Sequence, residues 1–205
     1  MKLNTFKFIC FAVLFSCTVF SCKDLTELNV NPNGVNPDNA NPNLVLSTVL
    51  TEAGRAFVNL GYQDIAGVIQ HTQKDGWSGG HNDYDWGGSQ SWAGYYDILR
   101  NNQYVYDRGV AINSELHQGI ALVMKSMMFG LITDLWGDAP YSAALKGAVG
   151  GAENTFPAYD SQEAIYTGIL ADLEKANTLL SKNAAEYTAT VGAADVYYQG
   201  APAKW

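Results

Sequence analysis

The chain has 205 residues, of which 12 are basic and 20 acidic, so its formal net charge is −8 at pH 7. That balance argues against nucleic acid or anionic lipid headgroups as partners, since both need a positive protein face. Hydrophobic residues make up 47% of the chain and aromatic residues 12%, which suits a well-packed globular body and not a disordered one. The length fits one domain or part of a larger one.

The first 21 residues have the layout of a lipoprotein signal peptide. Lys2 and Lys7 make a positive start, and an almost unbroken apolar run over residues 8–20 follows. The run is too short to cross a hydrocarbon core of about 30 Å as a helix. Residues 19–22, Val-Phe-Ser-Cys, then form a lipobox, in which a small residue precedes the cysteine to be acylated. We expect cleavage before Cys22 and its lipidation by palmitate and related chains; an ordinary secretory signal with an incidental cysteine is the alternative.

Residues 22–43 are predicted to be a polar, lipid-anchored tether. Three Asn-Pro pairs recur here at a spacing of five residues, beginning at positions 31, 36 and 41. Proline fixes its own φ and restricts the residue before it, so this stretch is expected to be extended or rich in turns. It would carry the remaining domain, residues 44–205, away from the membrane surface.

Apolar residues recur at helical spacing over four long stretches, and no stretch shows sustained strand alternation, so the predicted fold class is all-α. The expected helices cover residues 44–70, 92–110, 115–136 and 160–182. Gly61 is a candidate break in the first. The third is the most apolar and should be a buried helix that stops at Gly137 and Pro140. The fourth has a capping-box pattern, with Asp160 as N-cap and Glu163 three residues later.

Between the first two helices the periodicity collapses, and glycines alternate with aromatic residues. Trp77, Tyr84 and Trp86 stand here among Asn82 and Asp83. Sugar rings present C–H faces that lie against aromatic planes, while their hydroxyl groups hydrogen-bond to amides and carboxylates, and glycine allows close approach to the backbone. These five are therefore the predicted ligand-binding residues. The alternative is that the three aromatic side chains plug the helical core.

Other aromatic and sulfur-containing side chains stand at helical spacing within the expected helices. Their spacing predicts core positions, because side chains three or four residues apart share one helix face. They are Trp92, Tyr95, Tyr96, Met124, Met127 and Met128.

No motif supports a catalytic or metal site. A G-x-S-x-G match at residues 76–80 lacks the preceding strand that a nucleophile elbow needs. His71, His81 and His117 show no metal-binding spacing and are predicted to be surface or loop residues. Residues 83–88 begin like a calcium loop but lack the glutamate that completes an EF-hand, which leaves acidic turn residues or an irregular calcium site. The other two cysteines would leave with the signal peptide, so no disulfide framework and no cofactor is expected.

Several stretches together resemble the SusD/RagB family of nutrient-binding outer-membrane lipoproteins. The most specific is the run Trp-Gly-Asp-x-Pro-Tyr over residues 136–141, which follows a long apolar helix. The lipobox, the Asn-Pro tether, the run at residues 92–96 leading to Asn101 and Asn102, and the helix from Tyr159 match as well. The resemblance covers essentially the whole chain. Family members are usually more than twice as long, so we expect residues 44–205 to be the amino-terminal part of a SusD-like domain.

The resemblance implies an all-α body of tetratricopeptide-like helix pairs with long irregular loops, incomplete in this chain. It also implies lipid anchoring at the cell outer membrane, surface exposure, and a lid-like role on a TonB-dependent transporter of the SusC type. Family members capture glycans, and in some branches peptides or other nutrients. The tetratricopeptide sequence pattern, with its period of about 34 residues, is absent, so the repeat expectation rests on the family alone.

We therefore expect a lipid-anchored binding protein, not an enzyme, that captures an oligosaccharide or other nutrient and passes it to a membrane transporter. Two other classes stay open. A lipid-anchored glycoside hydrolase would need two carboxylates about 5–9.5 Å apart across a cleft, and Asp83, Asp85 and Asp138 offer candidates. A helical protein-interaction scaffold would suit the same architecture. The identity of the ligand is beyond the sequence.

Overall fold

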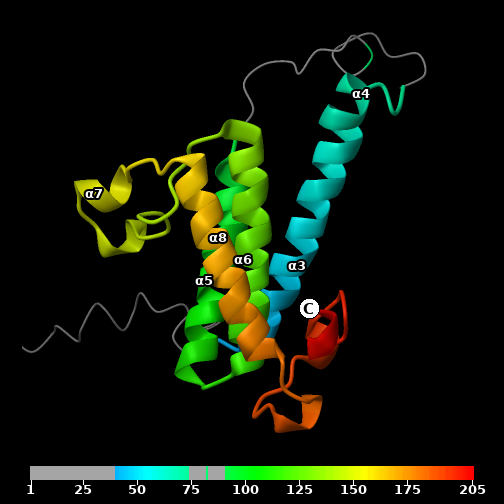
Figure 1. The fold of residues 1–205 in the computed structure, drawn as a ribbon, viewed down its shortest axis with the longest axis vertical. Coiled ribbons are helices and arrows are strands. Elements are labelled where there is room, and N and C mark those ends of the chain that lie inside the picture. Colours follow the sequence, from blue (N-terminus) through cyan, green and yellow to red (C-terminus); the bar gives the residue numbers. More distant parts are fainter. Residues whose placement is uncertain (1–39, 74–81, 83–90) are drawn as a thin grey trace, which may run out of the picture. The chain divides into compact units, whose positions relative to one another are not determined.

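The computed structural model describes residues 40–73, 82 and 91–205 (Figure 1). The chain divides into two units, residues 1–40 and 41–205, and the second holds almost all the described residues. Cys22, the signal peptide and most of the tether lie outside them. Within the described ranges the regular structure is helical, and the only strand-like feature is an isolated bridge between Ala139 and Asp160. The predicted all-α class is confirmed.

Four long helices pack as antiparallel neighbours. They are α3 (Pro42–Asn59), α5 (Ala93–Ala111), α6 (Glu115–Trp136) and α8 (Gln162–Leu180). α3 packs on α5, α5 on α6, and α6 on α8. A three-residue link joins α5 to α6 and turns the chain back on itself, as short links in helical bundles do. The short helix α7 (Ala152–Thr155) lies in the long connection between α6 and α8 (Figure 1).

α3 begins two residues before its expected start at Leu44. Asn41 is the N-cap: its backbone is extended, as a residue before proline prefers, and its Oδ1 accepts a hydrogen bond from the Asn43 backbone N–H (3.0 Å). Pro42 takes the first helical position, where no N–H is needed and its fixed φ suits the helix. The last Asn-Pro pair therefore starts the helix and does not belong to the tether.

The chain stays helical past Gly61, where a break was expected. A π-helical turn over Leu60–Ile65 follows α3, and in it the Ala66 N–H bonds to the Gly61 carbonyl. The short helix α4 (Ala66–Val68) then completes the run. At this glycine the backbone hydrogen bonds change from the α-helical to the π-helical pattern, which is longer by one residue, and the helix does not end there.

α6 is buried because both α5 and α8 pack against it. Its fully buried side chains include Met124, Met128, Phe129 and Ile132. The predicted core positions of Met124 and Met128 are confirmed, and Met127 is partly buried against the same core. By length and composition α6 could cross a membrane, but 56% of its apolar window is buried inside the structure, as in the core helix of a soluble protein.

His117, predicted to lie at the surface or in a loop, is buried near the start of α6 with 1% of its surface exposed. Its Nδ1 lies 2.6 Å from Ser114 Oγ and its Nε2 lies 2.7 Å from Asn43 Oδ1. Because an amide oxygen can only accept, the neutral ring donates from Nε2 and accepts the Ser114 hydroxyl at Nδ1. Asn43 Nδ2 donates in turn to the Thr190 carbonyl (3.2 Å). This chain of bonds joins α6, α3 and the segment after α8.

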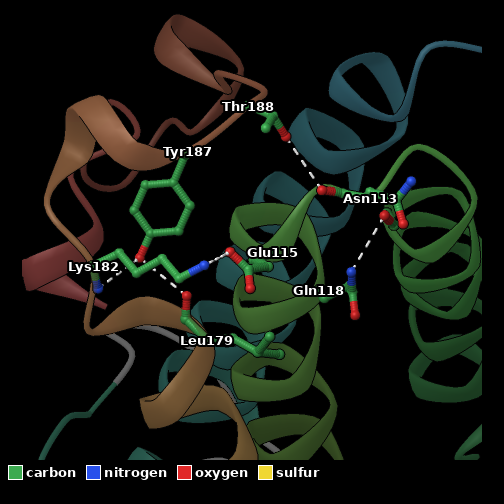
Figure 2. A network of polar contacts seen from close by, with 8 residues as sticks. Asn113, Glu115, Gln118, Leu179, Lys182, Tyr187 and Thr188 are labelled. Atoms are coloured by element: carbon green, nitrogen blue, oxygen red, sulfur yellow. Dashed lines mark hydrogen bonds and ion pairs between the residues drawn. The ribbon is translucent and has the colours of Figure 1, made fainter.

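The segment after α8 returns to the amino-terminal end of α6. In Figure 2, Lys182 forms an ion pair with Glu115 in the first turn of α6. The Tyr187 hydroxyl donates to a carbonyl in the last turn of α8 (3.0 Å), and Thr188 Oγ1 donates to the Asn113 carbonyl (3.2 Å). These bonds fix the irregular chain against the link between α5 and α6.

Asp195 organises the last described stretch of the chain. It is fully buried, and its Oδ1 accepts the backbone N–H groups of Tyr197 and Tyr198, both at 3.0 Å. Its Oδ2 accepts the Gly200 N–H (2.9 Å) and the Trp205 indole N–H (2.8 Å). Four donors therefore satisfy the buried charge. The Tyr197 hydroxyl donates to an α3 carbonyl (2.7 Å), which ties this stretch to α3.

We predict that mild acid destabilises the protein through His117. Burial lowers the pKa of this ring from 6.5 to about 4, so the unfolded state binds the proton more tightly than the folded state. Stability is then complete above about pH 6.5 and falls as the pH drops towards 4, with a slope of up to about 1.4 kcal/mol per pH unit. Urea unfolding measured at steps across this interval checks the slope.

The control for this measurement is the second described histidine. His117→Gln removes the titrating ring and should flatten the slope between about pH 6.5 and 5, above the range in which ordinary carboxylates titrate. His71→Gln changes an exposed ring and should leave the slope as it is. Equal slopes in all three proteins would contradict the prediction.

Candidate functional site

The chain after α6 makes a tight turn that brings the start of α8 alongside it. Gly137 ends α6 with a φ of 76°, which favours glycine, and its N–H bonds to the Thr133 carbonyl (2.8 Å). The backbones of Ala139 and Asp160 then exchange two hydrogen bonds, at 3.1 and 3.0 Å. The expected stop after Trp136 is confirmed, and the two helix ends lie side by side.

The Asp160 carboxylate spans this turn, and its predicted role as N-cap is wrong. Its Oδ2 accepts the N–H groups of Tyr141 (3.0 Å) and Ser142 (2.8 Å), and its Oδ1 accepts the Ser142 hydroxyl (2.9 Å). The bond from the Ser142 N–H is the main cause that lowers the pKa of Asp160. Ser161 is the N-cap instead, since its Oγ accepts the Ala164 N–H (3.2 Å). The Asp160 carboxylate instead accepts hydrogen bonds from Ser142, 18 residues earlier in the chain.

Tyr141, the last residue of the Trp-Gly-Asp-x-Pro-Tyr run, is fixed by contacts of its ring and hydroxyl with several side chains. Its hydroxyl donates to Asp172 (3.1 Å), and Lys125 pairs with the same carboxylate (2.7 Å) while its ammonium stands 5.1 Å from the ring centre. Phe129 meets the ring edge-on at 4.7 Å. Burial, and then Asp172, raise the pKa of this phenol. Gly168 leaves room for the ring, because a Cβ there would stand 2.5 Å from Tyr141 Cε1.

A groove opens beside this turn, and we name it the aromatic groove. Its volume is about 530 Å³, within the range of roughly 300–1,000 Å³ for small-molecule sites. Its walls come from the start of α5, the chain after α6 and the chain before α8. The lining residues are Trp92, Ala93, Tyr96, Asp97, Pro140, Ala144, Leu145, Thr155, Phe156, Pro157 and Tyr159.

Four of the eleven described residues that line the aromatic groove are aromatic. Phe156 is 80% exposed and Tyr159 61% exposed, so both offer ring surface to a ligand. Trp92 is half-buried and contacts Tyr96, Trp136 and Tyr159 with ring centres 5.7 to 5.9 Å apart. The aromatic lining therefore runs without interruption from the groove into the helical core.

The polar groups of the aromatic groove are few. The Tyr96 hydroxyl donates to the Pro140 carbonyl (2.7 Å), and burial, with smaller effects from Tyr159 and Asp160, raises the pKa of Tyr96 to about 12. The phenol is therefore neutral at physiological pH and serves to hold the wall. Asp97 is the charged residue among the described lining residues. Such a site stacks flat, uncharged rings and hydrogen-bonds at their edges.

A second, smaller groove lies between α3 and α5, and we name it the polar groove. Its volume is about 310 Å³. Its side chains are mostly charged or amide-bearing, unlike those of the aromatic groove. The lining residues are Glu52, Arg55, Ala56, Asn59, Gly94, Tyr95, Asp97, Ile98 and Asn101.

Of the five predicted ligand residues, the structure describes one. Trp77, Asp83, Tyr84 and Trp86 lie outside the described residues, so their predicted role is not tested. Asn82 is described, and it stands half-buried in a turn.

Trp92, Tyr95 and Tyr96 were predicted to be core, and they pack partly buried against it. They also line the two grooves.

Phe156 and Tyr159 are not among the residues predicted from the sequence to bind a ligand. The signal that could have found them is the one used for Trp77 and Trp86: aromatic residues in a stretch without helical periodicity, next to glycines and a proline. This pattern does not by itself predict exposure, since Tyr141, which also lies outside the long helices, packs against the core.

Comparison with known proteins places this geometry in a family. The sequence profile of the SusD-like family, described as starch-binding and associating with the outer membrane, matches residues 39–205. The chain belongs to the SusD-like family. The match includes all four long helices and every residue of both grooves. The resemblance to SusD/RagB proteins predicted from the sequence is confirmed.

Three solved structures share the SusD-like fold. A SusD homologue from Bacteroides fragilis NCTC 9343 superposes with a TM-score of 0.60 at 26% identity, over 82% of this chain and 33% of that one. A SusD/RagB family protein from Bacteroides thetaiotaomicron VPI-5482 gives 0.56 at 22% identity, over 82% and 35%. A protein from Bacteroides vulgatus ATCC 8482, named for the outer membrane and nutrient binding, gives 0.58 at 23%, over 81% and 33%.

The chain spans about a third of the length of these solved relatives. No curated protein matches it. The predicted helical-pair, SusD-type fold with long irregular loops is confirmed for the part of the chain that the structure describes.

We predict that Asp160→Asn destabilises this SusD-like chain by about 1–1.5 kcal/mol, because a hydrogen bond to a charged group contributes about 1.5–3 kcal/mol and one to a neutral group about 0.5–1.5 kcal/mol. An asparagine oxygen in the place of Oδ2 can still accept the N–H groups of Tyr141 and Ser142, but it carries no charge, so these bonds weaken. Urea unfolding at pH 7 measures the loss. Asp134→Asn is the matched control, since Asp134 is exposed and accepts one bond, from the Tyr166 hydroxyl (2.5 Å). Equal losses in the two variants would argue that Asp160 does not hold the turn.

Proposed function

We propose that this SusD-like chain is a surface-exposed, lipid-anchored module that binds a glycan and delivers it to a TonB-dependent outer-membrane transporter of the SusC type. The observation that carries the proposal is the aromatic groove, in which Phe156 and Tyr159 offer exposed ring faces beside the half-buried Trp92. The description of the family as starch-binding and outer-membrane-associated supports a glycan ligand and this location. The transporter as partner follows from the family resemblance.

The chemistry of the aromatic groove suits sugars better than it suits most other nutrients. A pyranose ring has flat C–H faces that can stack on Phe156 and Tyr159, and hydroxyl groups that can donate to Asp97.

The loop between α4 and α5 is proposed to supply the rest of the site, through Trp77, Asn82, Asp83, Tyr84 and Trp86. Its aromatic and amide side chains have the same chemistry as the two grooves. Trp86 stands six residues before Trp92 in the sequence. A chain of that length spans at most about 21 Å, so Trp86 is tethered within reach of the aromatic groove.

We propose binding without turnover. Asp138, one carboxylate that a glycosidase pair could use, serves the scaffold, because its Oδ1 accepts the Gln162 N–H at the start of α8 (3.0 Å). Asp83 and Asp85, the other two, lie outside the described residues. A chromatographic check that bound oligosaccharides are recovered at their original length tests this part of the proposal, and shortened products would favour the hydrolase alternative.

The proposal predicts that Phe156→Ala and Trp77→Ala each weaken glycan binding several-fold. A stacked aromatic contact contributes about 0.5–1.5 kcal/mol, which corresponds to roughly a two- to tenfold change in affinity. The measurement is calorimetric titration of the protein with a panel of neutral and acidic oligosaccharides. Circular dichroism of each variant reports whether the helices are intact.

Leu170→Ala is the matched control, since Leu170 is an apolar side chain, 66% exposed, that lines neither groove. It should bind as the parent protein does. Normal affinity in Phe156→Ala would remove the aromatic groove from the site, and unfolding of Trp77→Ala would show that this ring fills the core. A parent protein that binds no glycan in the panel would refute the proposed function itself.

The anchor proposal predicts that Cys22→Ser abolishes membrane association. The serine variant keeps the signal peptide but lacks the thiol that takes the acyl chain, and multiple acyl chains supply the stable anchoring. Labelling cells with a radioactive fatty acid and fractionating their membranes gives both readouts. A variant that still carries label and sediments with the outer membrane would contradict the anchor at Cys22.

A further inference from the structure

The aromatic groove and the polar groove flank the same first turns of α5. Neighbouring residues there divide between them: Ala93 and Tyr96 line the aromatic groove, while Gly94 and Tyr95 line the polar groove. Successive helix residues point about 100° apart, so this division is the expected result of one helix standing between two hollows. Asp97 lines both grooves and therefore stands on the boundary.

The residues on the boundary between the two grooves have small or exposed side chains. Ala93 and Gly94 are both exposed and carry the smallest side chains available. A Cβ built on Gly94 would meet no heavy atom within 4 Å. Asp97, the third boundary residue, is 62% exposed at its side chain. At Ala93 and Gly94 the helix surface between the two hollows therefore carries no long side chain, so one ligand can cross there.

The two grooves have different chemistry, and an oligosaccharide satisfies both. The aromatic groove offers Phe156 and Tyr159 for stacking. The polar groove offers amides and charged groups, among them Asn59 and Asn101, which can exchange hydrogen bonds with sugar hydroxyls. Linked sugar rings present a C–H face and a hydroxyl edge in every unit, so one ring can stack while its neighbour is hydrogen-bonded.

The charges along this path disfavour an acidic glycan. Two carboxylates, Glu52 and Asp97, line it. The cations nearby are already paired, Arg55 with Glu52 (3.3 Å) and Arg100 with Asp97 (3.1 Å). A uronate carboxylate would therefore leave water without an unpaired cation among the described lining residues to receive it, which costs free energy.

We infer that the ligand is an uncharged oligosaccharide of at least two rings, which crosses α5 over Ala93 and Gly94 with one ring in the aromatic groove and the next in the polar groove. Asp97 accepts hydroxyl groups from both rings. This inference rests on the proposed glycan-binding function and adds to it the minimum length, the neutral charge and the path of the ligand.

Gly94→Leu tests the path. The leucine would stand in open space on a helix, where it improves helix propensity over glycine, and it would raise the boundary between the grooves. Gly61→Leu is the matched control, because Gly61 is also exposed, has no heavy atom within 4 Å of a built Cβ and lines neither groove. Circular dichroism confirms that both variants keep their helices.

The probes are maltotriose, cellotriose, xylotriose and mannotriose, the corresponding monosaccharides, and trigalacturonate, each titrated into the full chain by calorimetry. At least one neutral trisaccharide should bind about tenfold or more tightly than its monosaccharide and than trigalacturonate, a difference of about 1.4 kcal/mol. In Gly94→Leu the ratio of trisaccharide to monosaccharide affinity should fall towards one. In Gly61→Leu it should match the parent protein.

The possible failures are distinct. An unchanged trisaccharide-to-monosaccharide ratio in Gly94→Leu overturns the path across α5. Trigalacturonate that binds as tightly as the best neutral trisaccharide overturns the uncharged class. Both of these results leave the proposed glycan-binding function standing. Failure of every sugar to bind the parent protein refutes the proposed function, and this inference with it.

Discussion

The tie between the end of α6 and the start of α8 is the constraint on which the rest of the site depends. The Ala139–Asp160 backbone bridge, closed by the Asp160 carboxylate, joins the two ends of the long irregular connection between α6 and α8. The two segments that the bridge joins each contribute a wall of the aromatic groove. Pro140 follows Ala139 directly, and Phe156 comes shortly before Asp160 in the chain. The Asp160 carboxylate is only partly buried, but both of its oxygens accept hydrogen bonds. It therefore holds the ends of α6 and α8 together, and this keeps the shape of the aromatic groove.

The helices could be predicted from the sequence because their cause is local. The boundaries of α6 were predicted at Glu115 and Trp136, since the apolar period and the glycine that ends the helix lie within the segment itself or next to it. His117 and Asp160 could not be predicted, because their partners are distant. His117 is buried against Asn43, 74 residues away, and Asp160 is used by a turn 18 residues before it. Tertiary contacts overrode the local pattern in both cases.

The candidate site was predictable in its chemistry and less so in its position. The argument that exposed aromatic rings among amides and glycines bind sugars applies to Phe156 and Tyr159 as well as to Trp77, yet only the glycine-rich loop has a pattern dense enough to draw attention. Trp92 shows the second difficulty. A single tryptophan at the start of a helix can both pack on the core and line a groove, and helical spacing predicts only the first of these.

Most residues of the run that is most specific for the family serve the scaffold. Gly137 turns the chain, Asp138 accepts the Gln162 N–H, and Tyr141 is enclosed by Phe129 and the Asp172 carboxylate. None of these three residues lines the aromatic groove. Pro140, between them, does line the aromatic groove. Under the proposed function, ligand selection falls to exposed side chains such as Phe156 and Asp97, which line the aromatic groove and take no part in the bridge between Ala139 and Asp160.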